Sequence, residues 1–419
     1  MRDWMTLLSP AALARLAGNA PWAASLHYRD FRLLWASTLL YSLGTGMENV
    51  AVGWLILNIT GSPFMVGVAA AARMAPFFFL GILSGAMSDR LDRRVFLIGI
   101  NLTGSMVAGI MAVMLLSGED RVWPIIGLVA AGGCVLAFAL TTRQAYTYDI
   151  VGPSHALNGL SLGSMAMQAG GIVGSLASGA LIGAFGPGWL YLVVGASYIA
   201  ATVVLLATGP IVESVEAHRE SILNNLAGYF RLIRENRILL VLMCLASITE
   251  VLGFTHMTLL PVFAKEVLFV GPLGLGVMTA VRQGGGFIGL ILLASLRDYR
   301  RKGMLMFVIA GAFGLALMAF SLSTNLFFFL VVLAVVNACA MAVDTLYKAL
   351  MQENVAEEER GRAMGSWVLS IGTAPVGHLG VGGLAGFLGA PGALLVNGGV
   401  LAFVSLGAAI GLPRLRRLP

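Results

Sequence analysis

The sequence predicts an all-α membrane protein with twelve transmembrane helices, arranged as two pseudo-symmetric six-helix bundles. Three observations support this prediction. Of the 419 residues, 58% are apolar and 11% are charged, whereas soluble domains carry roughly 25% charged residues. The apolar residues fall into twelve long runs. Features of the first half of the chain recur in the second half.

Each apolar run is expected to be a helix, because a helix needs about 20 apolar residues to cross the hydrocarbon core of a bilayer. The runs do not alternate between apolar and polar residues, which excludes a membrane barrel. The expected spans are residues 33–58, 63–87, 95–117, 123–142, 157–184, 187–208, 238–264, 272–296, 303–323, 326–349, 363–388 and 391–411.

These spans divide the chain into five parts. They are an N-terminal segment at 1–32, a first bundle at 33–208, a linker at 209–237, a second bundle at 238–411 and a basic tail at 412–419. In the linker, Ile222, Leu226 and Phe230 fall on one helical face. We therefore expect an amphipathic helix that lies on the inner membrane surface and joins the bundles.

Lysine and arginine are distributed unevenly between the two sides of this topology. In this topology the two chain ends and every second loop lie on the same side of the membrane. Of the 26 lysines and arginines, all but four lie on that side. The exceptions are Arg121 and Lys265 in loops of the other side, and Arg73 and Arg282 inside spans. Because lysine and arginine are enriched in cytoplasmic loops, we expect both termini to be cytoplasmic.

An internal repeat relates the two bundles. Five pairs of similar residues are each 209 positions apart, namely Pro63 and Pro272, Gly67 and Gly276, Arg73 and Arg282, Asp89 and Asp298, and Arg93 and Lys302. Further along, Asp149 matches Glu353 at an offset of 204. Two parallel halves of this kind are typical of transporters.

Several classes of site are excluded by the sequence. The only lysines are Lys265, Lys302 and Lys348, and none follows a glycine, so a G-x-x-x-x-G-K-[ST] nucleotide loop is impossible. The three cysteines lie in apolar runs without metal or disulfide spacing. The stretch "GLSLG" at 159–163 matches a hydrolase motif but opens an apolar span. We expect no enzyme activity, no cofactor or metal, and no nucleic-acid partner.

The charged loop between the second and third spans carries a recognisable pattern, "GAMSDRLDRRVF". Its residues Gly85, Asp89, Arg90, Arg93 and Arg94 are similar to the G-x-x-x-D-R-x-x-R-R motif of the major facilitator superfamily. Asp92 stands where many members have glycine. The stretches "YRDFRLLWASTLLYSLGTGM" and "RQAYTYDIVGPSHALNGLSL" resemble the macrolide-efflux and enterobactin-exporter-like branch. The resemblance covers nearly the whole chain.

This resemblance implies the major facilitator fold and proton-coupled export of a small amphipathic or lipophilic compound, such as a drug or siderophore-like molecule. It implies a monomer in the bacterial cytoplasmic membrane, with the substrate, protons and lipid as partners. One departure is the fifth span, where drug antiporters often carry G-P-x-x-G-G and this chain has "GSLASG" at 174–179. Two alternatives stay open: uptake or lipid translocation by the same fold, and a non-transporting membrane receptor or scaffold.

The resemblance also implies a cytoplasmic gate. It places Asp89 against the start of the eleventh span, where a carboxylate is stabilised by the helix N-terminus. It places Arg93 near Asp149, which follows the fourth span. Arg143, at the end of the fourth span, is assigned to the same gate.

The repeat extends this gate to the second bundle. By the same offset, Asp298 is expected to face the start of the fifth span, and Lys302 is expected to face Glu353. Ion pairs that form in only one of two states bias the equilibrium between them. Our hypothesis is that the two clusters hold the cytoplasmic side closed when the central cavity opens outward.

Replacing Asp89 with Asn is expected to impair transport while the protein still inserts into the membrane. The amide keeps the size of the side chain but removes the negative charge that the helix N-terminus attracts. Transport assays on membranes with matched protein levels test this expectation, and wild-type transport by the variant would remove the gate hypothesis.

Five ionisable residues inside the spans are candidates for proton or substrate binding. Glu48 and Glu250 lie near the middle of the first and seventh spans, His256 lies further along the seventh, and Arg73 and Arg282 occupy equivalent depths in the second and eighth. A charge at mid-membrane costs about 2.5–3.5 kcal/mol on insertion scales, so such residues are functional candidates. The alternative for Glu48 is a static pair with an arginine such as Arg73.

Overall fold

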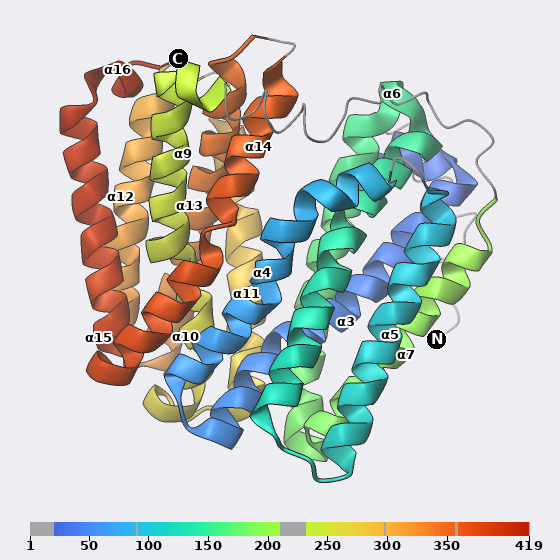
Figure 1. The fold of residues 1–419 in the computed structure, drawn as a ribbon. Coiled ribbons are helices and arrows are strands. Elements are labelled where there is room, and N and C mark those ends of the chain that lie inside the picture. Colours follow the sequence, from blue (N-terminus) through green and yellow to red (C-terminus); the bar gives the residue numbers. More distant parts are fainter. Residues whose placement is uncertain (1–20, 89–90, 210–231, 297–298, 357–358, 419) are drawn as a thin grey trace, which may run out of the picture.

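The computed structural model describes residues 21–88, 91–209, 232–296, 299–356 and 359–418. Within these ranges the regular elements are helices, with no strand. Two groups of helices stand side by side, and the chain passes from the first group to the second after residue 206 (Figure 1). Most of the linker at 209–237, where a helix is expected, and most of the segment 1–32 lie outside the described residues, while residues 232–235 of the linker are helical.

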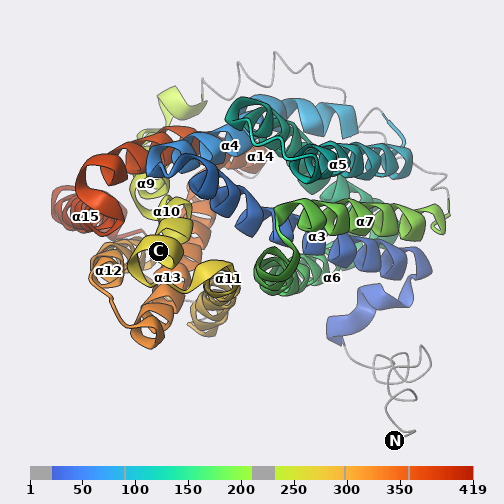
Figure 2. The same cartoon turned by 90° about the horizontal axis from the view of Figure 1, so that it is seen from below.

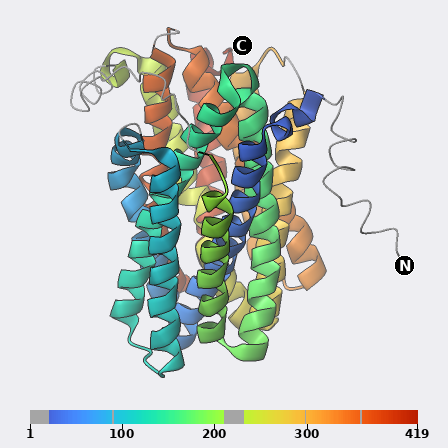
Figure 3. The same cartoon turned by 90° about the vertical axis from the view of Figure 1, so that its right-hand side faces the viewer.

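The N-terminal bundle contains one short 3-10 helix and five long helices. They are η1 (Pro21–His27), α3 (Arg29–Thr60), α4 (Pro63–Ser88), α5 (Arg93–Leu116), α6 (Val122–Phe185) and α7 (Pro187–Leu206). Helices α5 and α7 pack against each other on the flank that faces away from the second bundle (Figure 3).

Helix α6 holds two spans. Its 64 residues would extend about 96 Å at 1.5 Å per residue, three times the thickness of the hydrocarbon core. The chain turns back at Gly152, whose φ of 70° suits glycine, and Pro153 follows. The turn lies between the predicted spans 123–142 and 157–184, and both helices continue beyond those spans up to it.

The helices of the C-terminal bundle are interrupted more often than those of the N-terminal bundle. It comprises α9 (Arg237–Thr249), the π-helix η2 (Glu250–Phe254), α10 (His256–Val262), the π-helix η3 (Phe263–Val267), α11 (Gly271–Ser295), α12 (Lys302–Ser321), α13 (Leu326–Glu353), α14 (Arg360–Ile371), α15 (Ala374–Gly411) and α16 (Pro413–Arg416). Helix α15 turns back at Gly389, which has a φ of 71°.

The helices of the described chain account for twelve spans. Eight segments are long and apolar enough to cross a membrane, and two of them, Val122–Phe185 and Ala363–Gly411, each contain two spans joined at a glycine. Helices α3 and α4 supply the other two. The predicted all-α architecture with two six-span bundles is confirmed.

The bundles touch along two lines, α4 against α15 and α6 against α11 (Figure 2). Gly67 faces the carbonyl of His378, and a Cβ on Gly67 would overlap it. A Cβ on Gly276 would lie 2.6 Å from the carbonyl oxygen of Ser175. Gly67 and Gly276 match in the internal repeat, and both lie near the helix ends remote from Arg93. The bundles are thus in backbone contact at the end opposite the basic loops.

Candidate functional site

A buried ion pair links the first two spans. Arg73 Nη2 on α4 lies 3.1 Å from Glu48 Oε2 on α3, and the two side chains are 10% and 8% exposed. Taking both charges out of the aqueous phase is costly, and their mutual attraction offsets part of that cost. The structure therefore shows Glu48 paired with Arg73, the alternative to a free proton-binding carboxylate.

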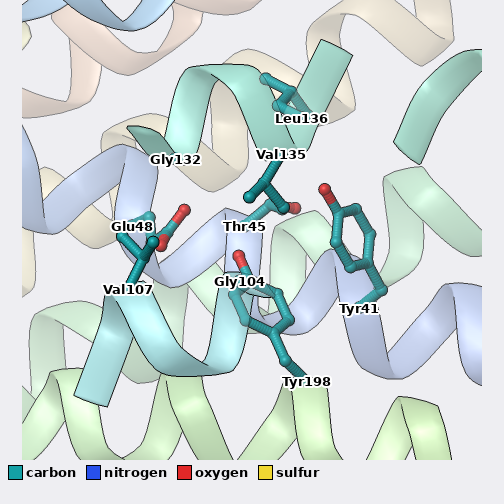
Figure 4. A pocket seen from close by; sticks show the side chains of 9 residues that line it. All are labelled: Tyr41, Thr45, Glu48, Gly104, Val107, Gly132, Val135, Leu136 and Tyr198. Atoms are coloured by element: carbon teal, nitrogen blue, oxygen red, sulfur yellow. The ribbon is translucent and has the colours of Figure 1, made fainter. Parts of the chain in front are cut away.

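A narrow hollow adjoins Glu48 inside the N-terminal bundle (Figure 4). Its polar wall is formed by Tyr41, Thr45, Glu48 and Tyr198, and the rest by glycine and aliphatic side chains of α5 and α6. The Tyr198 hydroxyl points towards the Glu48 carboxylate. A second hollow touches Glu48 and Arg73 beside Tyr191. Glu48 therefore stands between two openings that belong to one bundle.

Arg143 continues this polar arrangement and does not lie at the protein surface, where the gate prediction placed it. It is 4% exposed, and its guanidinium donates to Thr38 Oγ1 at 3.1 Å and to Asn101 Oδ1 at 2.9 Å. It also lies 4.4 Å from the ring centre of Tyr41, which stacks on Tyr198. A continuous set of polar side chains thus runs from Arg143 to Glu48. The tyrosines were missed because aromatic residues in apolar spans usually serve packing.

The equivalent region of the C-terminal bundle differs. Arg282 is the repeat partner of Arg73, and His256 stands 208 positions after Glu48. His256 is buried, with Nδ1 2.7 Å from the Gly253 carbonyl and Nε2 3.3 Å from the Asn337 amide. Among the described residues, no carboxylate pairs with Arg282, and its Nε is buried without a hydrogen bond. The repeat keeps the arginine, but the residue 209 positions after Glu48 is Met257, next to His256, so no acid stands there.

Glu250 belongs to a separate charged cluster. It is the first residue of the π-helix η2, a type of segment that is frequent at functional sites. Its carboxylate lies within electrostatic range of Asp344 and Lys348 on α13. Those two form the i,i+4 ion pair expected of their spacing, at 2.7 Å. Trp367 on α14 completes the cluster by contacting both members of that pair.

The two ion pairs expected for the basic loops are present. Arg93 pairs with Asp149 and also donates to the Ala145 carbonyl. Lys302 pairs with Glu353 in the other bundle. Each pair joins neighbouring helices of one bundle, α5 to α6 and α12 to α13, and neither crosses between bundles.

The rest of the loop motif is described only in part. Arg94 donates to the Leu206 carbonyl at 2.7 Å, at the end of α7. Gly85 lies in the last turns of α4. Asp89, Arg90 and Asp298 lie outside the described residues.

The sequence has relatives among known transporters. A family model described as transmembrane secretion effector matches residues 19–417. The staphyloferrin A transporter of Staphylococcus aureus is 23% identical, covering 83% of this chain and 87% of its own length. The multidrug efflux pump Tap of Mycobacterium tuberculosis is 26% identical over 93% and 94%. Macrolide efflux protein A of Streptococcus pyogenes is 20% identical over 79% and 83%.

Solved structures share the fold. The nucleoside transporter NupG, in a mutant form, superposes with a TM-score of 0.77 at 14% identity, covering 90% of this chain and 99% of its own. A bacterial homolog of the human lysosomal transporter Spinster, inward-facing and occupied, gives a TM-score of 0.72 at 16% identity over 94% and 99%.

Proposed function

Because the chain belongs to the transmembrane secretion effector family of the major facilitator superfamily, we propose that it exports a small amphipathic or lipophilic compound in exchange for protons. It is a multi-pass membrane transporter and not an enzyme. Relatives named for staphyloferrin A, for macrolides and for multiple drugs support this class of substrate. In this proposal it acts as a monomer in the bacterial cytoplasmic membrane with both termini in the cytoplasm.

The buried Glu48–Arg73 pair carries the proposal of proton exchange. A proton that binds Glu48 cancels its charge and releases Arg73, so the contact between α3 and α4 changes. Helix α4 also carries Gly67, six residues before Arg73, which packs on α15 of the other bundle. Protonation within the N-terminal bundle is thereby connected to the interface that separates when the protein rocks between its two states.

Efflux of ethidium from proteoliposomes with an imposed pH gradient tests this proposal. We expect flux to follow the gradient and to reverse with it, and we expect Glu48→Gln to lose at least about tenfold of the gradient-driven rate, because an amide cannot cycle a proton. Glu119→Gln is the matched control, since Glu119 lies in an exposed ion pair with Arg121. Flux that ignores the gradient would favour uptake or lipid translocation, and no flux with any probe would favour a receptor.

A further inference from the structure

The cluster on α13 and α14 has the chemistry of a cation site. Lys348 Nζ lies 2.7 Å from Asp344 Oδ2 and 4.0 Å from the centre of the Trp367 ring. Trp367 Nε1 donates to the other oxygen of Asp344 at 2.6 Å, which fixes the plane of the indole. An ammonium group is therefore held between a carboxylate and an aromatic face, the combination that proteins use to bind organic cations.

The cluster holds one more acidic side chain than Lys348 can neutralise when both acids are ionised. Glu250 lies within electrostatic range of Asp344 and Lys348, so the region contains two acids and one base. Among the described residues, no hydrogen bond or ion pair satisfies the Glu250 carboxylate. With both acids ionised the excess negative charge would be costly at this depth, and one additional monovalent cation, or a proton on Glu250, would balance it.

The Lys348 side chain is bound by its neighbours but remains partly exposed. Its side chain is 31% exposed, and that of Asp344 is 16% exposed. The ammonium sits on a flexible four-carbon stem, so it can leave the indole face without any change in the backbone. An i,i+4 pair that only stabilised α13 would need neither the ring of Trp367 nor a second acid.

We propose that Trp367, Asp344 and Glu250 form a recognition site for the cationic group of a substrate, and that Lys348 occupies this site when the substrate is absent. The incoming cation displaces the Lys348 ammonium from the indole face and takes its place beside Asp344, while Glu250 supplies the second negative charge. This inference rests on the proposed transport function and names the substrate class as organic cations with an apolar body.

Binding of tetraphenylphosphonium to the purified full chain in detergent, measured by equilibrium dialysis, tests the site. Removing the internal competitor in Lys348→Ala is expected to tighten binding about tenfold. Adding Trp367→Leu to that variant is expected to weaken it about tenfold again. Lys265→Ala is the matched control, since Lys265 lies in η3, away from the cluster, and its removal should leave binding unchanged.

The uncharged analogue triphenylphosphine oxide separates charge from shape, because its binding should not respond to either lysine substitution. Unchanged or weaker tetraphenylphosphonium binding in Lys348→Ala, or an equal gain for the neutral analogue, would overturn the inference. Lys348→Met keeps the apolar stem and replaces the Ala variant if that one does not fold. The binding measurement uses no proton gradient. Its result therefore does not depend on whether the protein exchanges protons in proteoliposomes, and the two proposals can fail separately.

Discussion

Replacing Arg73 with Met is expected to lower the free energy of unfolding by about 3–5 kcal/mol, the cost of breaking a buried ion pair by removing one partner. The loss arises because the Glu48 carboxylate, 8% exposed, would keep its charge without the guanidinium 3.1 Å away. The double variant Glu48→Gln/Arg73→Met removes both charges and should recover most of this stability. Chemical unfolding of the purified variants in mixed micelles measures the difference.

Arg282→Met is the matched control for this cycle. Arg282 occupies the equivalent position of the other bundle, but no carboxylate among the described residues pairs with it, so its removal should cost little or nothing. Equal losses in the single and double variants would show that Arg73 stabilises the protein through contacts other than Glu48. The folded double variant should also lose proton exchange, which separates the structural role of the pair from its role in transport.

Replacing Gly276 with Val is expected to separate the bundles at the end opposite the basic loops and to reduce transport by more than about tenfold. Its Cβ would lie 2.6 Å from the Ser175 carbonyl oxygen and 3.3 Å from the Gly179 Cα, so the backbones of α6 and α11 must move apart. A bias of 1.4 kcal/mol against this contact already shifts the equilibrium between states tenfold. Val at Gly67 should act in the same way on α4 and α15.

Spin labels on exposed loops at that end of the two bundles report this change. Ser117 and Thr324 lie on exposed turns of the two bundles, and the distance between labels there should increase in Gly276→Val. Gly284→Val is the control on the same helix, because a Cβ at Gly284 meets no atom within 4 Å. An unchanged label distance with normal transport in Gly276→Val would mean that this contact does not hold the state seen here.

Most of the fold could be predicted because the bilayer restricts it so strongly. A span must be a helix of about 20 apolar residues, so composition alone located the spans. The predicted boundary between spans 363–388 and 391–411 coincides with the turn at Gly389. The turn at Gly152 lies between the predicted spans 123–142 and 157–184, although the two helices extend further towards it than the apolar runs do. Hydropathy does not mark where those helices end, because a helix satisfies its own backbone hydrogen bonds in water as well as in lipid. The breaks in the seventh span, at η2 and η3, also leave no signature in an unbroken apolar run.

The candidate site was predictable where charge alone identified it. Glu48, Glu250, Arg73 and Arg282 stand out because ionisable residues are rare in spans. Trp367 did not, since an isolated tryptophan in an apolar helix has many ordinary explanations and its contact with Lys348 depends on how α13 and α14 pack. Tyr41 and Tyr198 could have been found from the sequence, because each places a hydroxyl group inside a span, and a buried hydroxyl group needs a hydrogen-bond partner.

The glycine contacts between the bundles have a consequence for how opening proceeds in time. Dispersion attraction between atoms falls off so steeply that a gap of 0.5–1 Å already forfeits about a quarter to a half of it. At Gly67 and Gly276 backbone rests directly on backbone, with no long side chains to slide past one another as the surfaces part. We therefore expect separation to be abrupt, with half-open forms scarcely populated and a dwell time set by one barrier instead of a series of small steps.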